Sequence, residues 1–158
     1  ASGGVMSKQV IIGASIAVGF AAGAAYHSKL VRGVRNNNPL NIEYNRFNAW
    51  DGQVGSDGRF CIFQNPVYGF RAAAKVLRSY NKQGYQTLSQ VITRFAPSHE
   101  NNTQHYINSV AKWSGIKPGQ VVPVYDNAAL AKVLLSMSRM EVGKYFAYEA
   151  ALKGVELA

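Results

Sequence analysis

The chain contains the stretch Arg35-Asn36-Asn37-Asn38-Pro39-Leu40-Asn41-Ile42, and its four asparagines cannot form the interior of a helix or strand. The Asn amide competes for backbone hydrogen bonds, and Pro39 prevents a helix from running through the stretch. A solvated turn is the ordinary interpretation. The alternative is a set of amide donors and acceptors facing a polar ligand. Because Tyr44, Phe47 and Trp50 follow closely, and aromatic faces beside amides hold sugar rings, the pattern favours a carbohydrate site.

Length and composition allow one domain with a real core, since the chain has 158 residues of which 47% are hydrophobic. The single cysteine, Cys61, excludes an internal disulfide and a cysteine-based zinc site. It lies in an alternating segment typical of a strand, so we expect a packed thiol rather than a nucleophile. The three histidines lack metal-ligand spacing and no glycine-rich phosphate loop is present. We therefore expect no metal and no cofactor.

The formal charge of +9 predicts an anionic partner, which could be nucleic acid, lipid headgroups or the acidic bacterial cell wall. The lysines and arginines are scattered rather than striped, and no nucleic-acid motif is present, so nucleic acid is not the expected partner.

The N-terminal part, residues 7–31, contains an uncharged stretch at 9–26, preceded by residues 1–6, which resemble an expression scar and a native Met6 start. The stretch is just long enough to span a bilayer as a hydrophobic helix. A buried helix of a globular core and a cleaved signal peptide are the alternatives. Gly19 and Gly23 form a small-residue pair through which two such helices could associate. Positive residues beyond the stretch favour an interior or cytoplasmic position for residues 32–158.

The sequence of residues 32–158 predicts an α+β fold that is mainly α. Residues 41–64 form a small β region, with strands at 41–44 and 60–63 and a turn at 56–58. A helix begins at Asn65-Pro66 and ends at Gly84, and Thr87 caps a second one. Further helices follow Asn101 or Asn102, run from Asp126 to Gly143, and cover about 145–157.

Glu141 is the acid with the most suggestive position among the eight in the chain. It follows Leu134 by seven residues and Met137 by four, so it shares the apolar face of its helix. Burial there would raise its pKa and let it deliver a proton near neutral pH, as glycosidic bond cleavage requires. Pairing with Lys144 or Arg139 at a frayed helix end explains the position equally well.

Glu100 is the second candidate acid, although a carboxylate before a helix start is also favoured by the helix dipole. Glu43 lies beside the Asn stretch and could line the same cleft.

Several motifs together resemble a family of small phage and prophage proteins, often described as virion structural proteins and suspected of degrading peptidoglycan. They are the stretch Arg32 to Ile42, Trp50-Asp51-Gly52, Phe60 to Phe63, Tyr68 to Ala72, Arg94 to Pro97, Glu100 to Thr103, and Tyr106. The resemblance covers residues 32 to about 150. It includes a Glu followed by Gly and an aromatic residue, here Glu141, Gly143 and Tyr145. Met140 and Leu40 depart from the family, where His and Gly are expected.

A more distant resemblance is to lytic transglycosylases and glucosaminidases of the lysozyme superfamily. There a helix with a catalytic Glu precedes an Asn-rich strand and a Trp-x-Gly hairpin. Here the strand and hairpin come first and the Glu141 helix last, which is the order of a circularly permuted lysozyme-like fold. Permutation is tolerated where the former termini were close and exposed.

The resemblances imply a phage enzyme that cleaves peptidoglycan between MurNAc and GlcNAc, as a lytic transglycosylase in preference to a muramidase, and the uncharged stretch 9–26 predicts that it is membrane-anchored. Glu141 would be the general acid and then the base, with Glu100 auxiliary. We expect the anchor to lie in an internal virion membrane, or in the host inner membrane facing the periplasm. A non-catalytic, glycan-binding virion structural protein is the alternative. The predicted substrate-binding residues are Asn37, Asn38, Asn41, Glu43, Trp50, Asn101 and Tyr106.

Overall fold

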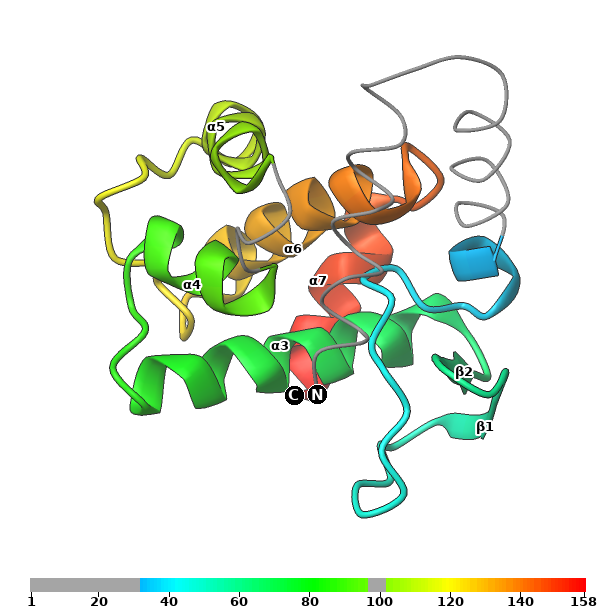
Figure 1. Cartoon of the computed structure of the whole chain (residues 1–158). Coiled ribbons are helices and arrows are strands. Elements are labelled where there is room, and N and C mark those ends of the chain that lie inside the picture. Colours follow the sequence, from blue (N-terminus) through cyan, green and yellow to red (C-terminus); the bar gives the residue numbers. More distant parts are fainter. Residues whose placement is uncertain (1–31, 97–101) are drawn as a thin grey trace.

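The structure is a computed structural model that describes residues 32–96 and 102–158. The predicted N-terminal hydrophobic helix therefore lies outside the described residues, as do Glu100 and Asn101. Within the described residues the protein is mainly helical, with one two-stranded antiparallel hairpin (Figure 1). The predicted mainly helical α+β class is confirmed. No helix in the described ranges has both the length and the apolar character needed to cross a bilayer.

The hairpin pairs β1 (Gln53–Ser56) with β2 (Cys61–Phe63), and Gly58, with a φ of 95°, lies in the predicted turn between them. The register is irregular between Gln53 and Gly55. We did not predict β1, because its sequence, Gln-Val-Gly-Ser, has one apolar residue and no alternation to indicate a strand.

The strand predicted at 41–44 is wrong. The segment makes only an isolated bridge between Glu43 and Phe60. The side chain of Asn38 explains the difference, because its Oδ1 accepts the N–H of Ile42 at 2.8 Å. That N–H is consequently unavailable to a neighbouring strand, and the local side-chain bond replaces sheet pairing.

Five helices follow the hairpin, and the predicted caps explain where three of them begin. Asn65 accepts the N–H of Val67, Thr87 forms a capping box with Gln90, and Asp126 accepts the N–H of Ala129. The final helix begins three residues later than predicted. The helices are α3 (Pro66–Lys82), α4 (Leu88–Phe95), α5 (Thr103–Ser114), α6 (Asn127–Val142) and α7 (Tyr148–Leu157).

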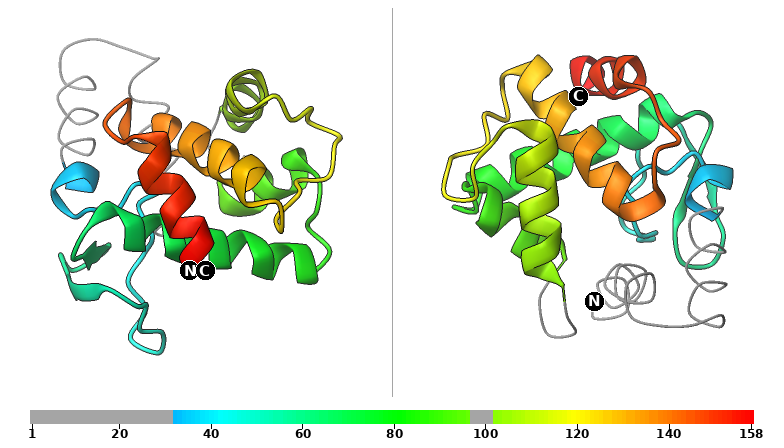
Figure 2. Two further views of the ribbon diagram at one scale, coloured as in Figure 1. Left: turned by 180° about the vertical axis from the view of Figure 1, so that it is seen from behind. Right: turned by 90° about the horizontal axis from the view of Figure 1, so that it is seen from above.

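Helices α3, α6 and α7 form the centre of the domain. The last helix, α7, packs against both α3 and α6, and α5 lies against α6 and α4 (Figures 1 and 2). Gly154 of α7 makes the contact with α3 possible, since a Cβ there would lie 2.5 Å from the backbone oxygen of Val67. The hairpin packs beside the start of α3, so the β region and the α3–α4 pair enclose a common space.

Candidate functional site

The asparagine stretch is held by its own amides. Asn37 and Asn41 have φ values of 51° and 50°, a conformation that Asn tolerates better than most residues. The Nδ2 of Asn38 donates to the backbone oxygens of Ile42 and Cys61, at 2.9 Å each, and the Nδ2 of Asn37 donates to Phe63 at 3.0 Å. Asn38 is fully buried. These two amides therefore attach the stretch to β2, and the amide of Asn38 faces the interior.

A polar clamp attaches the residues just before the stretch to the hairpin turn. Arg32 forms a bidentate ion pair with Asp57, and Asn36 donates to the same carboxylate at 2.7 Å. Burial alone would raise the pKa of Asp57. Hydrogen bonds from Arg32, from the Phe60 and Arg59 backbone and from Asn36 outweigh burial, and the pKa falls well below its usual value of 3.8.

We expect this clamp to make stability depend on pH at the acid end. A carboxyl whose pKa is lower in the folded protein than in the unfolded chain stabilises the fold fully at pH values above its unfolded pKa. That stabilisation is lost as the pH falls from about 4 toward the lowered pKa of the folded protein. The melting temperature of wild type should fall as the pH is lowered through that range. Asp57→Asn should melt at a lower temperature than wild type at pH 7, but its melting temperature should fall less over the same pH range. Thermal unfolding from about pH 7 to 2 measures both. Equal pH slopes for the two proteins would contradict the assignment.

Cys61 is a packed thiol, as predicted. It has no exposed surface, and its Sγ lies 3.5 Å from the backbone oxygen of Glu43. Burial raises the pKa of the thiol to about 11, so it is protonated at neutral pH and is a poor nucleophile.

Glu141 points inward from the last turn of α6, as predicted, and is 1% exposed. The hydroxyl of Tyr106, on α5, donates to its Oε2 at 3.2 Å. Tyr106 is itself completely buried. Its pKa is raised well above 10, first by burial and then by the negative charge of Glu141 and the hydrogen bond to it. The nearby Arg139 stacks on the Trp113 ring, with its Cζ 4.0 Å from the ring centroid.

Gly33 brings the asparagine stretch to the Glu141 end of α6. A Cβ on Gly33 would lie 2.4 Å from Cγ1 of Val142 and 2.9 Å from Oδ1 of Asn41. Both side chains therefore touch the same glycine, although they are about a hundred residues apart in sequence. Asn41 is 1% exposed, and its Nδ2 has no hydrogen-bond acceptor among the described residues. The asparagine stretch and the Glu141 end of α6 therefore lie close together at Gly33.

A cleft of about 760 Å³ lies between residues 42–50 and helices α3 and α4. It is lined by two predicted site residues, Glu43 and Trp50. The Oε1 of Glu43 also lies 3.6 Å from the Nε of Arg59. The wall also includes residues from motifs quoted from the sequence, none of them predicted as a site residue: Ile42, Tyr44, Arg94 and Phe95. The sequence did not single out the rest of the wall, which consists of Asn45, Arg46, Asn48, Val76 and Tyr80.

Tyr80 lines the cleft from α3, and it also contributes electrostatically to the raised pKa of Tyr106, after burial and Glu141. In the described ranges no group of three His, Cys, Asp or Glu side chains could hold a metal ion.

Comparison with known proteins shows the family of the chain. No family model matches the chain. The chain is 35% identical over 153 residues to Protein P5 of Pseudoalteromonas phage PM2, an alignment that covers 93% of the chain and 94% of that protein. The chain belongs to the family of phage PM2 Protein P5. It is therefore a member of a phage protein family, and the relationship extends along nearly the whole sequence of both proteins.

The Tyr106–Glu141 pair gives a direct stability test in this phage protein. Tyr106→Phe removes the hydroxyl that donates to a buried carboxylate, so we expect the free energy of unfolding at neutral pH to fall by about 1–3 kcal/mol. Tyr125→Phe is the matched control, because Tyr125 is 65% exposed and its hydroxyl is accessible to water. Urea unfolding curves at pH 7 measure the difference. Equal midpoints for the two variants would show that the hydrogen bond contributes nothing.

Proposed function

We propose that this protein is a phage peptidoglycan-degrading enzyme that cleaves the glycan strand between MurNAc and GlcNAc, with Glu141 as general acid and then general base. The observation that carries the proposal is the position of Glu141. It is a buried carboxyl at a helix end, hydrogen-bonded by Tyr106, in a domain that also contains a cleft lined by aromatic and amide side chains. Such a cleft suits a sugar polymer.

The chemistry requires two proton transfers, one from Glu141 and one back to it. Glu141 protonates the glycosidic oxygen, the bond from that oxygen to C1 of MurNAc breaks, and the GlcNAc hydroxyl departs. In a lytic transglycosylase the 6-hydroxyl of the same MurNAc then attacks C1 and returns its proton to Glu141. We favour this route over a muramidase because it needs one carboxyl and no activated water. The carboxyl must become accessible when the glycan fills the cleft, since it is 1% exposed without it.

The remaining roles belong to the same proposal. The fold would be a circularly permuted lysozyme-like domain, with Glu43, Trp50, Asn37 and Asn101 on the glycan side and Glu100 as an auxiliary carboxylate. The other predicted glycan-binding residues, Asn38, Asn41 and Tyr106, are buried. The hydrophobic residues 9–26 would anchor the protein in an internal virion membrane or the host inner membrane, with Gly19 and Gly23 available for self-association. The charge of +9 would hold the domain on the anionic cell wall.

A second function is favoured by the burial of Glu141. A carboxyl with 1% exposure and a hydrogen-bonded tyrosine can serve the fold alone, while the open cleft binds glycan. The protein would then be a non-catalytic virion structural protein that holds peptidoglycan without cutting it.

Purified sacculi distinguish the two functions. We expect wild type to clear a suspension of sacculi and to release fragments with anhydro ends, which mass spectrometry identifies. Fragments with reducing ends would indicate a muramidase instead. Protein that pellets with undigested sacculi and releases nothing would establish the binding function and contradict cleavage.

A further inference from the structure

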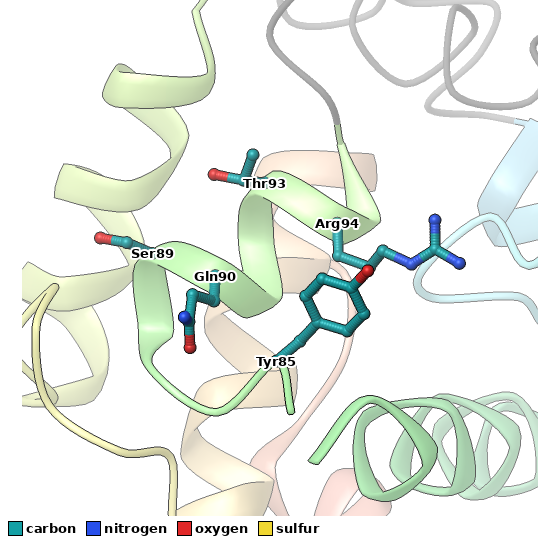
Figure 3. Close-up of a pocket in the computed structure, with 5 residues that line it drawn as sticks. All are labelled: Tyr85, Ser89, Gln90, Thr93 and Arg94. Atoms are coloured by element: carbon teal, nitrogen blue, oxygen red, sulfur yellow. The ribbon is translucent and has the colours of Figure 1, made fainter. Parts of the chain in front are cut away.

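Arg94, on α4, lies between the cleft and a second hollow. The second hollow has a volume of about 450 Å³ and is lined by Tyr85, Ser89, Gln90, Thr93 and Arg94 (Figure 3). Arg94 lines the cleft as well as the hollow. Figure 3 shows its side chain beside the Tyr85 ring, leaving α4 on the side away from Ser89. The two depressions therefore share one arginine as a common wall.

Two tyrosine rings position the guanidinium group at this junction. Its Cζ lies 5.8 Å from the centroid of the Tyr80 ring and 5.4 Å from that of Tyr85, and the two rings meet edge to face at 6.2 Å. Stacking on rings limits the motion of a guanidinium while leaving its N–H donors available. Arg94 is exposed and forms no ion pair within the described ranges, so its charge is available to a ligand.

The charges around the junction favour an acidic ligand. Arg46 also lines the cleft, and Glu43, the acid in its wall, already faces Arg59 at 3.6 Å. Ser89 and Thr93 add hydroxyls to the hollow, while the Oε1 of Gln90 is occupied by the N–H groups of Gln86 and Thr87. Aromatic rings, hydroxyls and an unpaired guanidinium together suit a sugar polymer that carries carboxylates.

We propose that a carboxylate-bearing glycan strand extends from the cleft across Arg94 into the second hollow, and that Arg94 binds one of its carboxylates. The proposal rests on the proposed function for the identity of the polymer, which would be peptidoglycan. It adds a subsite beyond the bond that is cut and makes Arg94 a determinant of preference for acidic over neutral glycans.

The test measures binding to two insoluble glycans, intact sacculi and sacculi whose carboxylates have been converted to neutral amides with a carbodiimide. We expect Arg94→Gln to bind intact sacculi about three- to tenfold more weakly than wild type, and to differ little from wild type on the neutralised sacculi. Lys153→Gln, on the exposed surface of α7, is the control for loss of one positive charge. It should change binding much less on either material.

A second variant tests the hollow itself. Thr93→Trp fills the space beside Arg94 without removing its charge, and we expect it to weaken binding to intact sacculi while the melting temperature stays near that of wild type. Binding by Arg94→Gln equal to that of Lys153→Gln on intact sacculi would overturn the proposal, and so would failure of wild type to bind sacculi. Binding with the expected Arg94 dependence but without cleavage would overturn only the proposed function.

Discussion

Glu141→Gln should abolish the clearing of sacculi, lowering the rate at least about a hundredfold, which is the usual contribution of a general acid. Glutamine keeps the shape of the side chain, and its Oε1 can still accept the hydrogen bond from the Tyr106 hydroxyl, but it has no proton to deliver. The fold should therefore survive. We expect a melting temperature within a few degrees of wild type.

The control for this variant is Glu156→Gln, which removes one carboxylate from the exposed end of α7. It should clear sacculi at the wild-type rate, so that the effect of Glu141→Gln cannot be attributed to a change in net charge. Turbidity and fragment release are measured for both. Full activity in Glu141→Gln, with activity lost in Glu100→Gln instead, would contradict the assignment.

Gly154→Ala should cause a large loss of stability from a single methyl group. The added Cβ would lie 2.5 Å from the Val67 oxygen, 2.6 Å from the Phe70 Cβ and 2.8 Å from the Arg71 nitrogen. Two of these atoms belong to the α3 backbone, so no side-chain rotation relieves the contact, and α7 must move away. We expect the free energy of unfolding to fall by about 2–4 kcal/mol, despite the better helix propensity of alanine.

Gly119→Ala is the matched control, because a Cβ there meets nothing within 4 Å and the backbone conformation is open to any residue. It should be neutral or slightly stabilising. Differential scanning calorimetry of the two variants measures the effect, with an expected fall of roughly 5–15 °C for Gly154→Ala. Similar melting temperatures for both variants would mean that α7 does not pack on α3 as closely as the structure indicates.

The local parts of the fold could be predicted because they depend on residues near one another in sequence. The Asn65, Thr87 and Asp126 caps mark helix starts by bonds that span two or three residues. The inward direction of Glu141 followed from helical periodicity alone. The strand at 41–44 failed because the Asn38 amide captured a backbone N–H that sheet pairing needed. No sequence pattern indicates that a side-chain amide will compete with a neighbouring strand for this N–H.

The candidate site likewise contains some residues that the sequence predicted and others that only the tertiary structure identifies. Glu43 and Trp50 were predicted from their nearness to the asparagine stretch, and both line the cleft. Asn38 was predicted to face sugar, yet its amide bonds the backbone of Ile42 and Cys61. Arg94 was noticed only as part of the motif Arg94 to Pro97, because its position between two depressions formed by separate segments is set by the tertiary structure.

The sequence by itself determined the mainly helical class, the starts of three helices, a packed thiol at Cys61 and a carboxyl on the apolar face of the last turn of α6. These follow from periodicity, capping and composition, which act over a few residues. Only the tertiary structure decided that Asn41 and Val142 meet at Gly33, and that Tyr106 reaches Glu141 across two helices. Such contacts depend on how complete elements pack, and the packing is set by the shape of the whole core rather than by any one segment.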